Sequence, residues 1–297
     1  MNSPRSLPVL FSLLFVASAH AAITITPTDS APLMFAAAEV QRAAKASGSS
    51  APNLALRVEP GVPQAYRIER DGEALRVVGG DAIGAMYGGL DVAEAIRTGT
   101  LDSLKDSQHR PHIAQRGIKF NIPLDVRTPT YTAREWPDSA RLNVGEMWSR
   151  DFWRETFDDM ARHRYNLISW WSMNPFPSIV KVPEFPNVAL EDVHSTGVDK
   201  EDLIVVKKMT IDEKIQFLRD VMQMAKDRGV EVYWFTWNVF LGAAEGKDGL
   251  TRDKTAKRYA LQYYFEVETG PVEATLVPLL AADLANVPYY VVRRANG

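Results

Sequence analysis

Hydrophobic and polar residues follow two distinct periods in residues 22–115. Four short segments alternate apolar with polar side chains, as strands with one buried face do. Two longer segments carry apolar residues at helical spacing. The predicted strands are 23–26, 54–60, 65–70 and 74–80, and the predicted helices are 32–47 and 82–99. This order of elements predicts a sheet with helices on one face.

Turn and cap residues mark the ends of these elements. Arg70-Asp71-Gly72-Glu73 supplies a hairpin turn between the last two strands. Asp81 is positioned to cap the second helix, and Gly99 to end it. The glycines at 84, 88 and 89 lie inside that helix, not between a strand and a helix. This position favours close helix packing over a nucleotide-binding loop.

From residue 115 onward the predicted strands are apolar along nearly their whole length. They are 115–125, 165–177 and a segment starting at 231, separated by helices predicted over 149–164 and 210–229. A capping box of Thr210 and Glu213 opens the second of these helices. A long loop is predicted over 178–209. Strands of this kind that alternate with helices are typical of a parallel sheet.

A doubly wound sheet and a (β/α)8 barrel both match this order of elements. No glycine-rich phosphate-binding motif follows any of the three strands, which disfavours a dinucleotide-binding fold. In both folds, ligands bind at the carboxyl ends of the strands. The residues at those ends are therefore the candidates for a functional site.

Side chains that suit carbohydrate recognition gather at these three strand ends. Amide, carboxylate and guanidinium groups hydrogen-bond sugar hydroxyls, and flat indole rings pack on the C–H faces of sugars. The candidate substrate-binding residues are Asp125 and Arg127 after the first strand, Trp171 and Asn174 at the second, and Trp237, Asn238 and Glu245 at the third.

Each candidate also has an interpretation without a ligand. Asp125 and Arg127 are near enough in sequence to pair with each other across a turn. Trp234 and either Trp170 or Trp171 are expected in the core, because a barrel strand points alternate residues into packed layers. Trp237 and Asn238 are as compatible with a packing role as with ligand binding. Glu245 lies in a glycine-rich loop, where a glutamate is more often a solvated charge.

Composition and charge narrow the classes of function. Apolar residues make up 46% of the chain and charged residues 24%, as in globular proteins. A net charge of −3 gives no basic footprint for nucleic acid. The chain has no cysteine, and its "HRPH" segment lacks the helical spacing of a zinc motif. We therefore predict no nucleic-acid partner, no cofactor and no metal site.

The first 21 residues resemble a targeting segment. Arg5 precedes an apolar run over 7–17, and Ala19-His20-Ala21 has the small-x-small pattern of a cleavage site. This pattern predicts a secretory signal peptide, with a buried N-terminal helix as the alternative. The run is too short to anchor the chain in a bilayer. We expect an exported protein, periplasmic or extracellular, that has no membrane contact after cleavage.

Tryptophan content divides the rest of the chain. All seven tryptophans lie between 136 and 237, and residues 22–115 contain none. The predicted domains are a signal peptide (1–21), an N-terminal α/β domain (22–114), the first three βα units of a TIM-type barrel (115–253) and a divergent C-terminal segment (254–297).

Several motifs resemble those of a known enzyme family. The segment "DAIGAMYGGLDVAEAIRTG" followed by "HRPHIAQRGIKFNIPLDVRTPTY" resembles the domain junction of α-glucuronidase-like glycoside hydrolases, and "YNLISWW", "MAKDRGVEVYWFTWNVF" and "GAAEGKDGLTRDKT" continue the similarity to about residue 253. In that family and the related hexosaminidases, a small non-catalytic α/β domain precedes a (β/α)8 barrel. The expected fold class is therefore α/β, a small N-terminal α/β sandwich domain followed by a TIM-type barrel.

The resemblance implies an exported glycoside hydrolase that acts on plant-type polysaccharide and releases uronic acid groups. Such enzymes use a pair of carboxylates, which in this family come from middle and later barrel strands, so the resemblance assigns no catalytic residue here. Residues 116–297 are fewer than the about 250 residues of a complete barrel. We therefore expect an incomplete barrel. The alternatives to a glycoside hydrolase are a carbohydrate-binding protein without catalysis and a fragment without function.

Overall fold

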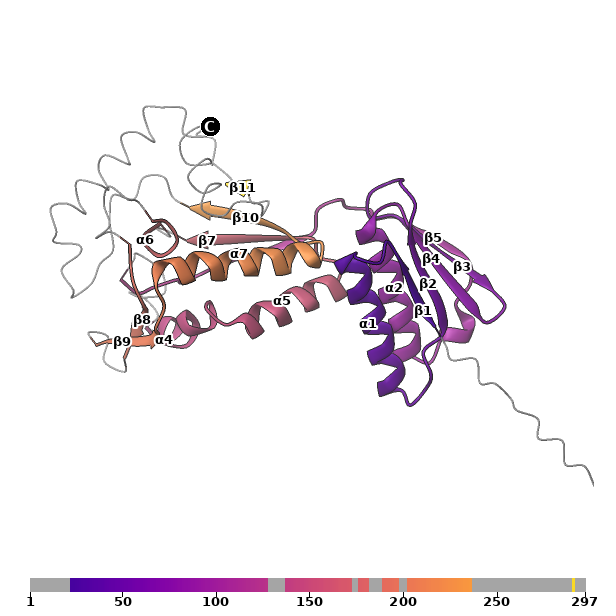
Figure 1. Ribbon diagram of the computed structural model, residues 1–297, viewed down its shortest axis with the longest axis horizontal. Coiled ribbons are helices and arrows are strands. Elements are labelled where there is room, and N and C mark those ends of the chain that lie inside the picture. The colour runs from indigo at the N-terminus through magenta and orange to yellow at the C-terminus, as the bar shows by residue number, and fades with distance from the viewer. Residues whose placement is uncertain are drawn as a thin grey trace, which may run out of the picture.

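Two large sheets and a small hairpin organise the protein (Figure 1). The computed structural model describes residues 22–127, 137–172, 176–181, 189–197, 202–236 and 290–291. The segment predicted as a signal peptide lies outside these residues. Within them, no helix is both long and apolar enough to cross a membrane.

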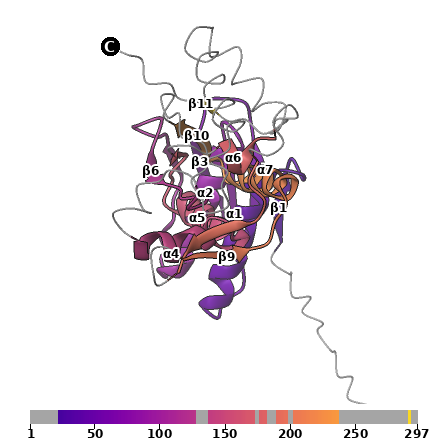
Figure 2. The ribbon, with the colours of Figure 1, turned by 90° about the vertical axis from the view of Figure 1, so that its left-hand side faces the viewer.

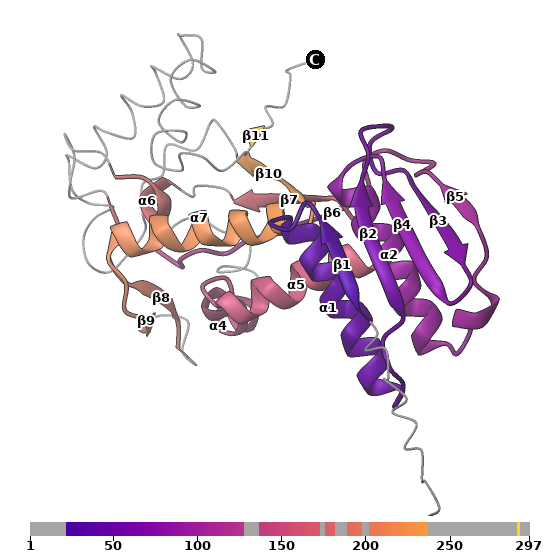
Figure 3. The same cartoon turned by 45° about the vertical axis from the view of Figure 1, so that its right-hand side comes forward.

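The N-terminal sheet is mixed and has the order β1-β2-β4-β3-β5. Its strands are β1 (Ile23–Thr26), β2 (Asn53–Val58), β3 (Tyr66–Asp71), β4 (Ala74–Gly79) and β5 (Ser107–His109). Helices α1 (Ala31–Ala46) and α2 (Ala82–Arg97) cover one face, and a 3-10 turn η1 (Leu101–Ser103) follows (Figure 3). A sheet with helices on one face was predicted and is confirmed. Strand β5 was not predicted, because its three residues are too short for a period to show.

Glycines bring α2 against the sheet and against α1. A Cβ atom added at Gly88 would lie 2.4 Å from Val77 Cγ1, and one at Gly89 would lie 2.8 Å from Ala36 Cβ. Both distances are shorter than real carbon contacts, so the helix reaches this position because these residues have no side chain. The prediction of close helix packing is confirmed.

The second sheet is parallel and has the order β11-β10-β7-β6. Its strands are β6 (Gly117–Asn121), β7 (Leu167–Ser172), β10 (Glu231–Thr236) and β11 (Tyr290–Val291). Helices α5 (Arg150–Arg162) and α7 (Ile211–Asp227) lie on the same face (Figure 1). Doubly wound sheets carry helices on both faces, whereas a barrel carries them on one. The described part therefore has a barrel-like arrangement, and its strands form an open sheet.

One prediction in this half is wrong in detail, and one helix was missed. The loop expected over 178–209 contains a hairpin of β8 (Val193–Thr196) and β9 (Leu203–Lys207), which is preceded by α6 (Phe176–Ile179). Helix α4 (Pro137–Glu146) was not predicted at all. These elements lie at the end of the molecule opposite the N-terminal sheet (Figures 1 and 2). The apolar side chains of β9 are largely exposed, so it lacks the alternation that marks a half-buried strand.

The N-terminal sheet and its helices pack at the amino ends of the parallel strands. Asn166, just before β7, donates from its side chain to Gln64 Oε1 at 3.1 Å and to the Ala114 carbonyl at 2.8 Å. Its Oδ1 accepts from the Arg116 amide at 2.7 Å. The arrowheads of β7 and β10 consequently point away from the N-terminal sheet (Figure 1). The carboxyl ends, where a ligand is expected, are turned away from it.

Candidate functional site

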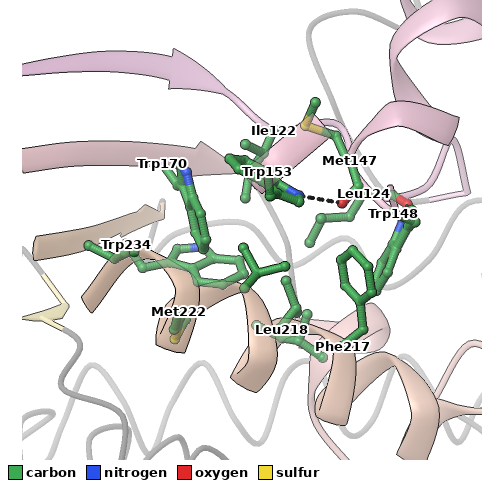
Figure 4. Packing of buried hydrophobic residues seen from close by; sticks show 14 of the residues in the cluster. Ile122, Leu124, Met147, Trp148, Trp153, Trp170, Phe217, Leu218, Met222 and Trp234 are labelled. Atoms are coloured by element: carbon green, nitrogen blue, oxygen red, sulfur yellow. Dashed lines mark hydrogen bonds between the residues drawn. The ribbon is translucent and has the colours of Figure 1, made fainter. Parts of the chain in front are cut away.

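The two faces of the parallel sheet have different surroundings. Ile168, Trp170, Val232 and Trp234 join one large apolar cluster with residues of α5 and α7. Figure 4 shows Trp170 and Trp234 within this cluster. The indole of Trp170 lies 4.8 Å from that of Trp153 on α5 and meets Trp234 edge-on at 5.4 Å. The question of whether Trp170 or Trp171 belongs to the core is thereby settled in favour of Trp170.

Trp171 lies on the opposite face of the sheet, where it is half-buried. It is paired in register with Asn121 on β6 and with Phe235 on β10, so these three residues form the last row of this face before the strands end. The rings of Trp171 and Phe235 are 6.5 Å apart. Side chains of different strands thus meet at one edge, as the rule for parallel sheets requires.

Lys119 brings a positive charge to this face. Its Nζ atom lies 5.0 Å from the centre of the Trp171 ring and 5.5 Å from that of Phe235. Sequence reasoning missed this residue, since it treated β6 only at its end. Strand alternation places Lys119 on the face of Asn121, two positions earlier, but does not show the rings that it meets.

Asp125 and Arg127 lie in the loop after β6 and pair with each other. Arg127 donates from Nε to Asp125 Oδ1 at 2.9 Å and from Nη2 to Oδ2 at 2.8 Å. Asp125 is 0% exposed and Arg127 5%. This is the alternative that the sequence left open, a pair across a turn. Their predicted contact with a substrate stays a prediction.

The buried pair also ties this loop to the hairpin beyond β7. Asp125 Oδ2 accepts from the His194 amide of β8 at 3.1 Å. Arg127 Nη2 donates to the carbonyls of Glu191 at 2.8 Å and Asp192 at 3.1 Å. The polar groups of both side chains are used in joining two loops, which is how a buried ion pair is kept satisfied.

Two further titratable groups adjoin this pair. Burial, followed by the charge of Arg127, lowers the pKa of His194, and its Nδ1 has no hydrogen-bond partner among the described residues. Lys214, on the first turn of α7, is 0% exposed and donates to the Leu190 carbonyl at 2.8 Å. Burial lowers the pKa of Lys214 to about 8.

The other predicted site residues are Asn174, Trp237, Asn238 and Glu245, and all four lie outside the described residues. Of the seven candidates, the structure places Trp171 at the carboxyl edge of the sheet. It places Asp125 and Arg127 in the loop that follows β6. In the part of the chain that is described, no three His, Cys, Asp or Glu side chains are grouped so as to hold a metal ion.

A fold of this kind occurs in glycoside hydrolases. No family model and no curated protein matches the sequence. Among solved structures, the chain is similar to a GH138 enzyme targeting pectin rhamnogalacturonan II, with 17% identity and a TM-score of 0.57 over 75% of this chain and 31% of the enzyme. At this identity, the likeness concerns the fold alone.

Lower scores relate the chain to GH20 enzymes. A GH20 β-N-acetylglucosaminidase gives 16% identity and a TM-score of 0.46 over 78% of this chain and 41% of that one. A GH20 β-N-acetylhexosaminidase from Streptomyces coelicolor gives 13% identity and a TM-score of 0.47 over 72% and 41%. The chain thus spans between about a third and two fifths of the length of these proteins. The α-glucuronidase resemblance itself stays a prediction.

Proposed function

We propose that this protein is a glycoside hydrolase that acts on plant-type polysaccharide and releases uronic acid groups. The observation that carries the proposal is the carboxyl edge of the parallel sheet, where Asn121, Trp171 and Phe235 form one row on the face away from α5 and α7. The likeness of fold to the GH138 enzyme supports it. The proposal includes export by a cleavable signal peptide, which mass analysis of the secreted chain tests.

The described residues serve substrate binding in this proposal. The Asn121 amide donates to and accepts from sugar hydroxyls, and the aromatic row supplies apolar surface for C–H groups. The buried Asp125–Arg127 pair holds the loop that borders this row. Hydrolysis needs a general acid and a second carboxylate that acts as base or nucleophile. No residue is assigned to either role.

A hydrolysis assay tests the proposal directly. We expect the secreted protein to release uronic acid from 4-O-methylglucuronoxylan oligomers or from pectin fragments, measured by chromatography of the products. Retardation in gels that contain these polysaccharides, without any product, would favour the alternative of a binding protein. If the protein shows no hydrolysis and no retardation, the result contradicts both the proposed hydrolase and the alternative of a binding protein.

A variant locates the binding surface. Trp171→Ala removes half of the aromatic pair, so we expect retardation to weaken about tenfold, as for a central aromatic residue of an interface. Tyr165→Ala is the matched control, because Tyr165 is an aromatic residue 38% exposed outside this face. Equal retardation of Trp171→Ala and the wild type, with folding intact by circular dichroism, would remove Trp171 from the site.

A further inference from the structure

Lys119 is an exposed cation whose position is set by two aromatic rings. Its ammonium lies within 5.0 Å and 5.5 Å of the ring centres of Trp171 and Phe235, inside the range of a cation–π contact. Two rings acting on one ammonium hold a long side chain that otherwise moves freely. The charge is therefore presented near the carboxyl edge of the sheet.

The neighbours of Lys119 on this face do not neutralise it. Its register partner is Ser169, which is itself paired with Tyr233, so both neighbours in its row are uncharged. The hydroxyl of Tyr233 accepts from Gln115 at 3.1 Å and donates to Glu231 at 3.4 Å. Within the described residues, no carboxylate forms an ion pair with Lys119.

We infer that Lys119 binds the carboxylate of an acidic sugar and so sets the preference for charged over neutral substrates. The ammonium lies over the ring of Trp171, so a ligand that reaches this face of the ring also meets the cation. The N–H bonds that point away from the rings are free to donate to an anion, and charge-assisted hydrogen bonds are the stronger kind. Trp171 and Phe235 act as positioning residues. This inference rests on the proposed function.

Paired ligands that differ in one group isolate the effect of charge. Oligogalacturonides and glucuronoxylan oligomers are compared with their carboxyl-reduced forms, in which each carboxylate has become a CH₂OH group, by calorimetry at low salt. We expect wild-type protein to bind the acidic form about tenfold more tightly, the lower end of the range for a hydrogen bond to a charged group. The ratio falls as salt is added, because salt screens an exposed charge.

Three variants test the residue. Lys119→Met keeps the unbranched stem without the charge, so its acidic-to-neutral ratio falls to about one, while Lys119→Arg keeps the cation and retains most of the ratio. Lys105→Met, a change at an exposed lysine of the N-terminal part, leaves the ratio unchanged. Lys119 lies on the surface, so these variants are expected to fold, which circular dichroism checks.

The outcomes separate this inference from the proposed function. If the wild type binds the acidic and the reduced forms with equal affinity, the inference is overturned and carbohydrate binding stands. A ratio that survives in Lys119→Met overturns it as well, and assigns the preference to another residue. Binding of neither form, together with no hydrolysis, overturns the proposed function along with the inference.

Discussion

At the residue scale, Lys214 is a cation whose pKa is strongly lowered by folding. It is fully buried, its Nζ lies 5.5 Å from the centre of the Trp148 ring, and it donates to the Leu190 carbonyl. Burial lowers its pKa to about 8, although the nearby carboxylates of Asp125, Glu191 and Asp192 oppose the effect. Removal from water therefore outweighs attraction to the surrounding negative charges.

This shift predicts a dependence of stability on pH. An unfolded lysine has a pKa of about 10.4, so between pH 8 and 10 the unfolded chain binds more protons at this site than the folded one. Raising the pH therefore favours the folded state. Relative to Lys214→Met, the wild type is expected to gain about 2 kcal/mol of unfolding free energy between pH 7 and 10.

Urea denaturation at several pH values measures this difference. Lys226→Met, at an exposed position of the same helix, is the control and follows the wild type across the range. If the free energies of unfolding of wild type and Lys214→Met differ by a constant amount from pH 7 to 10, the lowered pKa does not belong to Lys214.

At the element scale, α2 depends on residues without side chains. A Cβ on Gly88 would lie 2.4 Å from Val77 Cγ1 and 2.8 Å from Tyr66 Cδ2, both in the sheet below. Alanine is the better helix former, by about 1 kcal/mol. The steric conflict is the larger effect here, because overpacking a core costs about 1–3 kcal/mol and both neighbours are held by their strands.

Gly88→Ala is therefore expected to lower the free energy of unfolding, by about 1 kcal/mol net of its gain in helix propensity. Gly145→Ala in α4 is the control with the opposite sign, since a Cβ there meets nothing within 4 Å. Chemical denaturation of both variants measures the two effects. A stabilised Gly88→Ala protein would mean that α2 can move away from the sheet without cost.

At the scale of the whole molecule, one buried carboxylate joins the two halves. Glu39 of α1 is 1% exposed and accepts from Arg162 of α5 through Nε and Nη2, each at 3.0 Å. Arg42 also pairs with it, and Arg97 lies 3.6 Å away. Burial by itself would raise the pKa of Glu39, but these guanidinium groups hold the pKa below its usual value.

Glu39→Gln is expected to lower the free energy of unfolding by about 2–3 kcal/mol at pH 7, because Arg162 loses its buried partner and keeps only carboxylates of its own helix, such as Asp159. The folded pKa of Glu39 is lowered, so the advantage of the wild type is present above about pH 4.3 and disappears as the pH falls below it. Glu94→Gln, at an exposed position of α2, serves as control. Equal stability of wild type and Glu39→Gln at pH 7 would show that other contacts hold the halves together.

Much of the fold was predictable from short-range patterns. The helix predicted over 82–99 is observed at Ala82–Arg97, with the side chain of Asp81 accepting from the Gly84 amide. The capping box of Thr210 and Glu213 is present at the start of α7. The hairpin β8–β9 was missed because its strands are short and β9 buries little of its apolar surface.

The candidate site was predictable in part. The ends of the parallel strands pointed to Trp171, whose row at the carboxyl edge is observed. Lys119 was missed, since its importance comes from two rings on other strands, about 50 and 115 residues further along the chain. The partners of Asp125 beyond Arg127 lie in β8, which no local pattern indicated.

The sequence by itself determined where most of the longer helices and strands form, because periodicity, caps and turn residues act over a few neighbouring positions. It also determined that Trp170 and Trp171 point to opposite faces of a strand. Which of those faces is buried was decided by tertiary structure, since it depends on where α5 and α7 pack. The same holds for the charge at the carboxyl edge, because a cation–π contact exists only once distant strands pair in register.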